Sequence, residues 1–217
     1  MKAAPKPVRW AVVSDFDGTV TTFDVGDAVC MRFRAATKEE VEASYDPSVS
    51  VPRWMQRYFG RLSASPSEIE KFVRKAVSPR KGLSGFASFC RKGKIPFEIA
   101  SGGVDLYIRP LLSKWKLEDV KVFCGKHRHA GSGYRLSYPM LRGRSLEKFK
   151  ASRVRAFQKA GYKVVFCGDG PSDFPASRVA DAVFARHRLL VSCRRHGVKA
   201  RPLVSFDAIT SFIRKGY

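Results

Sequence analysis

The chain has 217 residues, of which 44% are hydrophobic and 12% aromatic, enough to bury the core of one domain with a small insert. This composition excludes intrinsic disorder, a collagen-like repeat and a coiled coil. The 41 Lys and Arg residues outnumber the 19 Asp and Glu residues, and the resulting formal charge of +22 favours a polyanionic partner without indicating any chemistry.

The cysteines indicate the compartment. They occur singly at positions 30, 90, 124, 167 and 193, without a CxxC pair, as is typical of reduced thiols that serve as small hydrophobes. No apolar stretch has the length of a membrane span, and residues 1–9 do not lead into a signal-peptide region. We therefore expect a cytoplasmic monomer or homodimer that does not bind membranes.

Short apolar runs alternate with helical stretches along most of the chain. The runs are apolar on both faces, as buried parallel strands are, and they cover residues 10–13, 95–100, 120–123, 163–166 and 181–185. Helices are predicted over residues 82–92 and 145–160, the second with Ser145 as its N-cap and Gly161 as its stop. The alternation predicts an α/β fold with a doubly wound, Rossmann-like parallel sheet, whose ligands bind beyond the carboxyl ends of the strands.

Residues 24–81 interrupt this alternation. Three segments in this range, 38–42, 54–59 and 67–73, predict about three helices, and Ser65-Pro66 is typical of a helix start with proline in the first turn. We expect a small helical cap inserted after the first strand. The predicted domains are a core formed by residues 1–23 and 82–217 and a cap formed by residues 24–81.

Residues 126–139 alternate around a Gly-Ser-Gly turn and predict a β-hairpin. His127 and His129 share one face of this hairpin. Because no third ligand is near them in the sequence, exposed hairpin side chains are favoured over a metal-binding pair.

Two acidic motifs follow predicted strands. Asp15 and Asp17 lie in Asp-Phe-Asp-Gly-Thr, and Asp169 and Asp173 lie in Gly-Asp-Gly-Pro-Ser-Asp. Carboxylates held close together resist ionisation unless a cation or protons intervene, although the first motif alone would also suit a solvated Asp-Gly turn. Together the two loops offer the oxygen ligands that a hard cation such as Mg²⁺ prefers.

A phosphate-binding group is predicted beside these carboxylates. Ser101 and Gly102, in Ser-Gly-Gly after another strand, offer a hydroxyl and unencumbered backbone N–H groups that suit phosphate oxygens. A lysine near the start of the helix after the hairpin, Lys148 or Lys150, adds a positive charge.

This ordered set resembles the haloacid dehalogenase-like phosphohydrolase superfamily. Asp15 to Thr19 match its DxDGT motif, Ser101 its second motif and Gly168 to Asp173 its GDGxxD motif, while the spacing of its lysine is met better by Lys150 than by Lys148. The position of the insert, between the first and second motifs, resembles the phosphoserine-phosphatase-like branch.

Further segments are similar to the enol-phosphate phosphatases of methionine salvage, namely Ile99 to Asp105, Arg109 to Leu112 and Phe184 to Arg186. These phosphatases carry a cysteine-rich stretch before their lysine, where this chain has Gly143 to Phe149. The difference leaves the substrate open but not the type of reaction.

The resemblance implies a Mg²⁺-dependent phosphatase that acts on a small phosphorylated metabolite. Asp15 would be the nucleophile that becomes an aspartyl phosphate, and Asp17 the general acid and base. The implied Mg²⁺ ligands are Asp15, the backbone carbonyl of Asp17, and Asp169, with Asp173 in a supporting role.

The implied phosphate ligands are Ser101, Gly102 and Lys150. Asp24 and Arg57 in the cap could contact the substrate, but Asp24 equally suits the N-terminus of a helix and Arg57 an exposed surface.

Four other functions stay open: a phosphoserine phosphatase, a phosphotransferase, a phosphatase of nucleic-acid ends, and a non-catalytic basic protein that binds nucleic acid. The last two rest on the charge of +22 and on a basic run that includes Arg142, Arg144 and Arg155. They are not favoured, because every catalytic carboxylate is present and no nucleic-acid-binding motif with interleaved aromatic residues is found.

Overall fold

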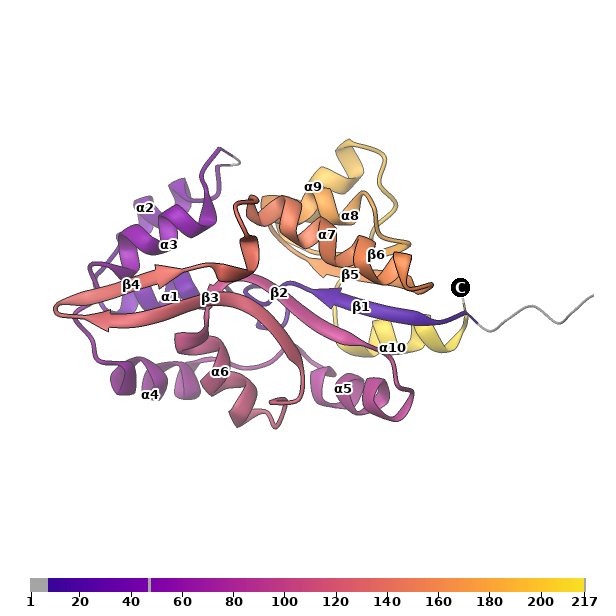
Figure 1. The fold of residues 1–217 in the computed structure, drawn as a ribbon, viewed down its shortest axis with the longest axis horizontal. Coiled ribbons are helices and arrows are strands. Elements are labelled where there is room, and N and C mark those ends of the chain that lie inside the picture. The colour runs from indigo at the N-terminus through magenta and orange to yellow at the C-terminus, as the bar shows by residue number, and fades with distance from the viewer. Residues whose placement is uncertain (1–7, 47, 217) are drawn as a thin grey trace, which may run out of the picture.

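A sheet of seven strands forms the centre of the protein, as a computed structural model that describes residues 8–46 and 48–216 shows (Figure 1). Its order is β4-β3-β2-β1-β5-β6-β7, with β4 antiparallel to β3 and the other neighbours parallel. The strands are β1 (Trp10–Ser14), β2 (Phe97–Val104), β3 (Lys121–Ala130), β4 (Gly133–Ser137), β5 (Lys163–Gly168), β6 (Ala182–Ala185) and β7 (Arg201–Pro202). The predicted doubly wound α/β sheet is confirmed.

Helices cover both faces of this sheet. In Figure 1, α7, α8 and α9 lie on one side, and α5, α6 and α10 lie on the other. These helices are α5 (Leu83–Lys92), α6 (Asp105–Lys114), α7 (Leu146–Lys159), α8 (Phe174–Ser177), α9 (His187–Arg195) and α10 (Phe206–Arg214). Two short 3₁₀ helices cover Pro139–Leu141 and Pro171–Asp173. The helices predicted over 82–92 and 145–160 are confirmed to within one residue at each end.

Four helices fill the insert after β1, one more than expected: α1 (Val25–Arg32), α2 (Lys38–Ala43), α3 (Val51–Phe59) and α4 (Pro66–Ala76). The predicted start of α4 is confirmed, because the Ser65 side chain caps the helix and Glu68 completes a capping box. The sequence does not reveal α1, which begins with a β-branched residue and a glycine, both poor helix formers.

Two strands run further than their apolar residues indicate. β2 continues through Ser101–Gly103 to Val104, and its register against β3 shifts between Ala100 and Val104. β3 also forms the first arm of the predicted hairpin, and the second arm, β4, lies beside α3 (Figure 1). The irregular register leaves the Ser-Gly-Gly segment inside a bulged strand and not after its end.

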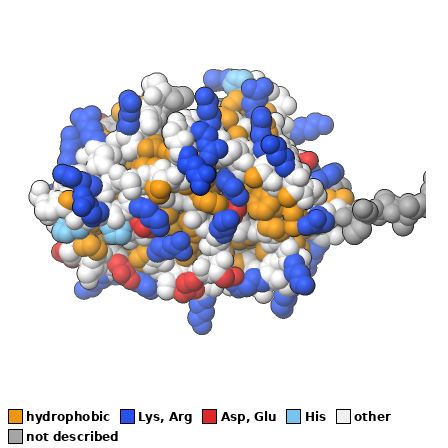
Figure 2. Space-filling model, in the orientation of Figure 1, with side chains coloured by type: hydrophobic (Ala, Val, Ile, Leu, Met, Phe, Trp, Pro, Cys, Tyr) orange, Lys and Arg blue, Asp and Glu red, His pale blue; other side chains and the backbone are white. Residues whose placement is uncertain are grey.

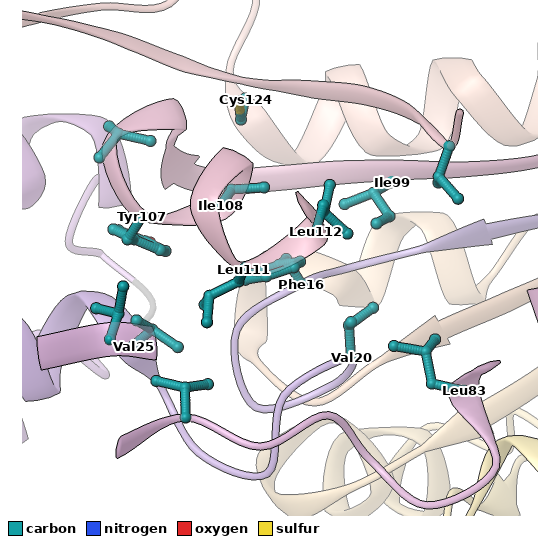
Figure 3. Packing of buried hydrophobic residues seen from close by; sticks show 14 of the residues in the cluster. Phe16, Val20, Val25, Leu83, Ile99, Tyr107, Ile108, Leu111, Leu112 and Cys124 are labelled. Carbon is teal, nitrogen blue, oxygen red and sulfur yellow. The ribbon is translucent and has the colours of Figure 1, made fainter. Parts of the chain in front are cut away.

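The largest hydrophobic cluster packs α6 against the loop that follows β1. Phe16 from this loop lies beside Leu111 of α6 (Figure 3), and Val20 and Ile108 belong to the same cluster; all four side chains are fully buried. Burying a side chain of this size contributes about 1.5–3 kcal/mol, so the cluster fixes the loop that carries Asp15 and Asp17. All five cysteines are free and buried, as a role as small core hydrophobes requires.

Across the described residues 8–46 and 48–216, no helix combines the length and apolar character needed to span a lipid bilayer.

Candidate active site

The sheet order brings the two acidic motifs together. β1 and β5 are parallel neighbours with Ser14 paired to Cys167, and the backbone N–H of Asp15 donates to the carbonyl of Cys167 at 2.9 Å. The residues after both strands therefore meet at one edge of the sheet. Carboxylate oxygens of Asp15, Asp169 and Asp173 all lie within 4.8 Å of one another.

Lys150 lies in the middle of this acidic group. Its Nζ is 2.7 Å from Oδ1 of Asp173 and 3.0 Å from Oδ1 of Asp15, and its side chain is only 1% exposed. Lys148, two residues earlier on α7, is exposed to solvent. Of the two lysines considered in the sequence, the structure brings Lys150 to the carboxylates.

Asp173 orders the second acidic loop. Its Oδ2 accepts hydrogen bonds from the backbone N–H groups of Asp169 and Gly170, each at 3.0 Å, while its Oδ1 accepts from Lys150. With both oxygens engaged, Asp173 holds the backbone of its neighbours in place.

Gly18 meets a steric requirement between the two loops. Its φ is +65°, and a Cβ atom there would lie 2.2 Å from Oδ2 of Asp169. A side chain would both strain the backbone and displace the Asp169 carboxylate. The glycine of the first motif therefore allows the second motif to approach.

Asp17 is held by three donors. Its Oδ1 accepts from the backbone N–H of Val25 at 3.1 Å, and its Oδ2 accepts from the Tyr107 hydroxyl at 2.9 Å and the Ser101 hydroxyl at 3.4 Å. Burial raises the pKa of Asp17 well above its usual range, and the negative charges of Asp24 and Asp15 raise it further. A carboxyl group with a raised pKa suits a general acid.

The metal-free carboxylates resist ionisation together. Burial raises the pKa of Asp15 from 3.8 to about 7, against the opposing effect of Lys150. The pKa of Asp169 is raised well above its usual range by burial and by the charges of Asp15 and Asp173. The single positive charge of Lys150 does not neutralise three carboxylates. The candidate metal ligands of these residues are all oxygen atoms, which a hard divalent cation such as Mg²⁺ prefers.

These residues form the floor of a cavity whose opposite wall comes largely from the insert. The apolar wall residues are Val49, Val51, Trp54 and Met55 from the insert and Leu146 from α7. Acidic residues on the same side are Asp24, Asp27 and Asp46 from the insert and Glu147 from α7. The cavity therefore has a floor of ionisable groups that could bind a metal ion and a wall of apolar side chains with several acidic ones among them.

The family model for haloacid dehalogenase-like hydrolases matches residues 12–178, which include both acidic motifs and Lys150. The chain belongs to this family. The resemblance seen in the sequence is thereby confirmed.

Curated relatives of this haloacid dehalogenase-like hydrolase cover nearly all of it. The 2-hydroxy-3-keto-5-methylthiopentenyl-1-phosphate phosphatase of Geobacillus kaustophilus is 31% identical over 211 residues, 93% of this chain and 94% of the relative. The phosphatase of the same name from Bacillus velezensis is 29% identical over 210 residues, 93% of this chain and 88% of the relative. A solved substrate-bound phosphoserine phosphatase shares the fold, with a TM-score of 0.73, 15% identity, and coverage of 96% of this chain and 99% of that one.

In this haloacid dehalogenase-like hydrolase, Ser101 and Gly102 also lie on the cavity. Ser101 is fully buried, and its Oγ accepts from the backbone N–H of Gly103 at 2.9 Å. A Cβ on Gly102 would lie 2.7 Å from Cγ1 of Val51 and 2.8 Å from Cδ2 of Leu146. Gly102 thus lets the insert and α7 close over the strand, with its backbone at the cavity surface.

The two predicted cap contacts have different positions. Asp24 lines the cavity and also caps α1, since its Oδ1 accepts from the backbone N–H of Asp27 at 2.9 Å. The position of Asp24 is therefore compatible with both roles considered in the sequence, a substrate contact and a helix N-cap. Arg57 is exposed on α3 and does not line the cavity.

Three side chains of the site were not found from the sequence. Tyr107 and Tyr45 hydrogen-bond to Asp17 and Asp27, respectively, and both line the cavity. Arg80 is 3% exposed, and its guanidinium donates to the carbonyls of Gly18 and Thr19 at 2.6 Å each and to that of Thr21 at 2.8 Å. None of these three side chains belongs to a recognisable sequence motif, because each contacts a residue that is distant in the sequence.

Of the two hairpin histidines, which the sequence predicts to be exposed, one is exposed and the other is half-buried against an aspartate. Nδ1 of His127 is 2.7 Å from Oδ1 of Asp105, and His129 is exposed. Among the described residues, the group of three or more candidate metal ligands is the one formed by Asp15, Asp169 and Asp173.

Proposed function

We propose that this hydrolase is a Mg²⁺-dependent phosphatase that acts on a small phosphorylated metabolite through an aspartyl phosphate on Asp15. The observation that carries the proposal is the position of the Asp15 carboxylate on the cavity floor. It lies 3.0 Å from the buried Lys150 ammonium and within 4.8 Å of the Asp169 carboxylate. A phosphate ester held there would face a nucleophile, a fixed positive charge and a cation site at once.

The two aspartates of the first motif divide the chemistry. The Asp15 carboxylate attacks phosphorus, and the bond from phosphorus to the ester oxygen breaks while Asp17 donates its proton to that oxygen. Asp17 then takes a proton from a water molecule whose oxygen attacks the aspartyl phosphate, releasing inorganic phosphate and restoring Asp15. The raised pKa of Asp17 supports this role, because burial and the nearby charges of Asp24 and Asp15 favour its protonated form.

The remaining floor residues bind and orient. Mg²⁺, when bound, would neutralise charge on the phosphoryl oxygens and on Asp15. Its proposed ligands are Asp15, the backbone carbonyl of Asp17, and Asp169, with Asp173 holding the loop. The proposed phosphate ligands are Ser101, Gly102 and Lys150.

We assign residues 24–81 as a cap over a core formed by residues 1–23 and 82–217. The wall that the insert contributes to the cavity supports this division. Because Arg57 is exposed away from the cavity, the proposal assigns a substrate contact to Asp24 and not to Arg57.

The cavity wall favours a substrate without a second anionic group. Among the described lining residues, Lys150 is the one Lys or Arg, and it is paired with Asp15 and Asp173. The carboxylate of phosphoserine would find no cation and would face Asp24, Asp27 and Glu147 instead. An uncharged leaving group with an apolar part fits this wall, as in the enol phosphate for which the relatives are named.

The excess of Lys and Arg belongs to the surface. On the face shown in Figure 2, Lys and Arg side chains are spread across the surface, interrupted by a few acidic groups, and do not gather in one stripe. We propose that this charge draws phosphorylated metabolites toward the site and does not bind nucleic acid as a groove would. The buried free thiols support the expected cytoplasmic location.

A phosphomonoester panel tests the function. The wild type is assayed with Mg²⁺ and with chelator on an enol phosphate analogue, phosphoserine, sugar phosphates and 5′-phosphorylated oligonucleotides. We expect Mg²⁺-dependent release of phosphate, fastest with the uncharged leaving groups. Asp15→Asn should abolish it, whereas Asp119→Asn, at an exposed aspartate paired with Arg91, should not. Turnover by Asp15→Asn at the wild-type rate would contradict the mechanism.

A further inference from the structure

One side of the insert is fixed firmly to the β3–β4 hairpin. The Gln56 side chain on α3 accepts from the backbone N–H of Leu136 at 2.7 Å and donates to the carbonyl of Tyr134 at 3.2 Å. The Tyr134 hydroxyl, in turn, donates to the carbonyl of Ala64 at 2.7 Å. Gly133 lies so close to Gly60 that a Cβ on it would be 2.0 Å from the Gly60 carbonyl oxygen. Several bonds and close backbone packing hold this side.

The opposite side of the insert reaches the core through Tyr45, just after α2. Nη1 of Arg188 on α9 donates to the Tyr45 carbonyl at 3.1 Å, and its guanidinium carbon lies 4.7 Å from the centre of the Tyr45 ring. Arg188 is exposed to solvent. One exposed hydrogen bond and one exposed cation–π contact contribute far less than the bonds and packing of the hairpin side.

Tyr45 separates two clefts. It lines the active-site cavity, where its hydroxyl donates to Oδ2 of Asp27 at 2.5 Å. It also lines a second, outer cleft that shares Asp24 and Asp169 with the cavity. Its remaining lining comes from the loops after β1 and β5 and from α9, which contributes Arg188, Arg195 and the exposed Val191. Displacing Tyr45 would join the basic outer cleft to the cavity.

We propose that the outer cleft is the substrate entrance of the cavity and that the contact between Arg188 and Tyr45 is its latch. A phosphate ester that approaches α9 meets Arg188 first, and a guanidinium binds a phosphate more strongly than a neutral carbonyl. The latch then opens while the hairpin side stays in place. The identity of the entering ligand rests on the proposed phosphatase function, whereas the position of the entrance rests on the contacts alone.

Hydrogen exchange without substrate tests the latch. In Arg188→Ala, amides of residues 38–46 should exchange roughly tenfold faster than in the wild type, because the loss of a charged hydrogen bond favours local opening. Exchange of β4 should stay unchanged. Arg188→Lys should restore part of the protection, and Arg194→Ala, at an exposed arginine on α9 that lines neither cleft, should match the wild type.

The converse variant separates the two sides of the insert. Gln56→Ala should speed exchange in β4 by a similar factor and leave residues 38–46 unchanged. Wild-type exchange over residues 38–46 in Arg188→Ala would overturn the latch. Because no substrate is present, this result does not depend on the phosphatase assay.

A bulky label tests the entrance. Burial raises the pKa of all five native thiols, so a maleimide dye should label a new exposed cysteine selectively. Val191→Cys places the dye in the outer cleft, and Val204→Cys, at a residue 74% exposed, places it elsewhere. Labelling should lower kcat/KM at least roughly tenfold in the first variant relative to its unlabelled form, and not in the second. An unchanged kcat/KM for labelled Val191→Cys would overturn the entrance.

Discussion

The floor and the wall of the cavity differ in almost every physical respect. The floor consists of buried charges, with Asp15, Asp169 and Asp173 around one lysine, at the ends of adjacent strands. The wall consists of apolar side chains from α3 and the segment before it, with acids at its margin. Charges on the floor must be compensated in pairs, so a change of one residue affects all the others. Apolar residues on the wall contribute separately, through shape and the lack of a cation.

This difference separates reaction from specificity. In the proposed function, the floor contacts only the phosphoryl group and so would accept a phosphate ester of any alcohol. The wall would then meet the alcohol, and its lack of a free Lys or Arg among the described lining residues would select against a second negative charge. Each prediction below changes one of the two regions and asks whether the other responds.

The largest effect is expected from Lys150→Met on the floor. The substitution leaves the Asp15 and Asp173 carboxylates buried without their cation, which costs about 3–5 kcal/mol of unfolding free energy. Loss of one electrostatic contact to the phosphoryl group should lower kcat by about 10²–10³-fold. Chemical denaturation and steady-state kinetics measure the two effects.

Lys148→Met is the matched control for this change, since Lys148 lies on the same helix but is exposed. It should alter neither the unfolding free energy nor kcat. Equal losses in the two variants would show that the charge of α7, and not the position of Lys150, matters.

A smaller effect is expected when a cation is added to the wall. Val49→Arg places a guanidinium at the cavity, where it can pair with a substrate carboxylate. The ratio of kcat/KM for phosphoserine to that for an uncharged phosphomonoester should rise at least roughly tenfold. Val49→Met, which adds length without charge, should not raise this ratio. If both variants raise it, shape and not charge sets the preference.

The last effect concerns the stability of the fold and its dependence on pH in the absence of metal, and it does not involve catalysis. Burial raises the pKa of Asp15 from 3.8 to about 7, and burial with the charge of Asp24 raises that of Asp27 from 3.8 to about 8. The folded state then holds protons that the unfolded state has released, so unfolding free energy should fall as pH rises from about 4 to about 8. Calorimetry of the chelated protein should show a Tm several degrees lower at pH 8 than at pH 5.

Asp27→Asn removes one of these titrating groups from the insert side. Its Tm should therefore depend less on pH, while Asp119→Asn should keep the wild-type slope. The same slope in all three proteins would mean that Asp27 does not titrate in this range.

The sequence predicts the floor much better than the wall. Asp15 and Asp169 follow apolar strands within spaced motifs, and parallel strands that end at one edge bring such residues together. Tyr107 and Arg80 escape prediction, because a tyrosine on an amphipathic helix and an arginine after an insert have no distinctive neighbours. Their roles depend on a hydroxyl that reaches Asp17 and a guanidinium that reaches three carbonyls of a distant loop.

The wall depends on how the insert folds over the core. The helical segments that supply Trp54 and Met55 are visible in the sequence, but the face that turns toward the cavity is set by contacts such as that of Gln56 with β4. Arg57 illustrates the limit. It is adjacent to Gln56 in sequence, yet it is exposed and lies outside the cavity.

The side-chain amide of Gln56 also affects how copies of this protein can associate. β4 is an edge strand, and such edges normally offer free N–H and C=O groups to a strand of another molecule. In the middle of β4, however, the Tyr134 carbonyl and the Leu136 N–H are already hydrogen-bonded to the Gln56 side chain. The opposite edge, β7, has two residues, one of them proline. Neither edge favours extension of the sheet into a second copy, so a homodimer of this chain would not form by joining two sheets edge to edge.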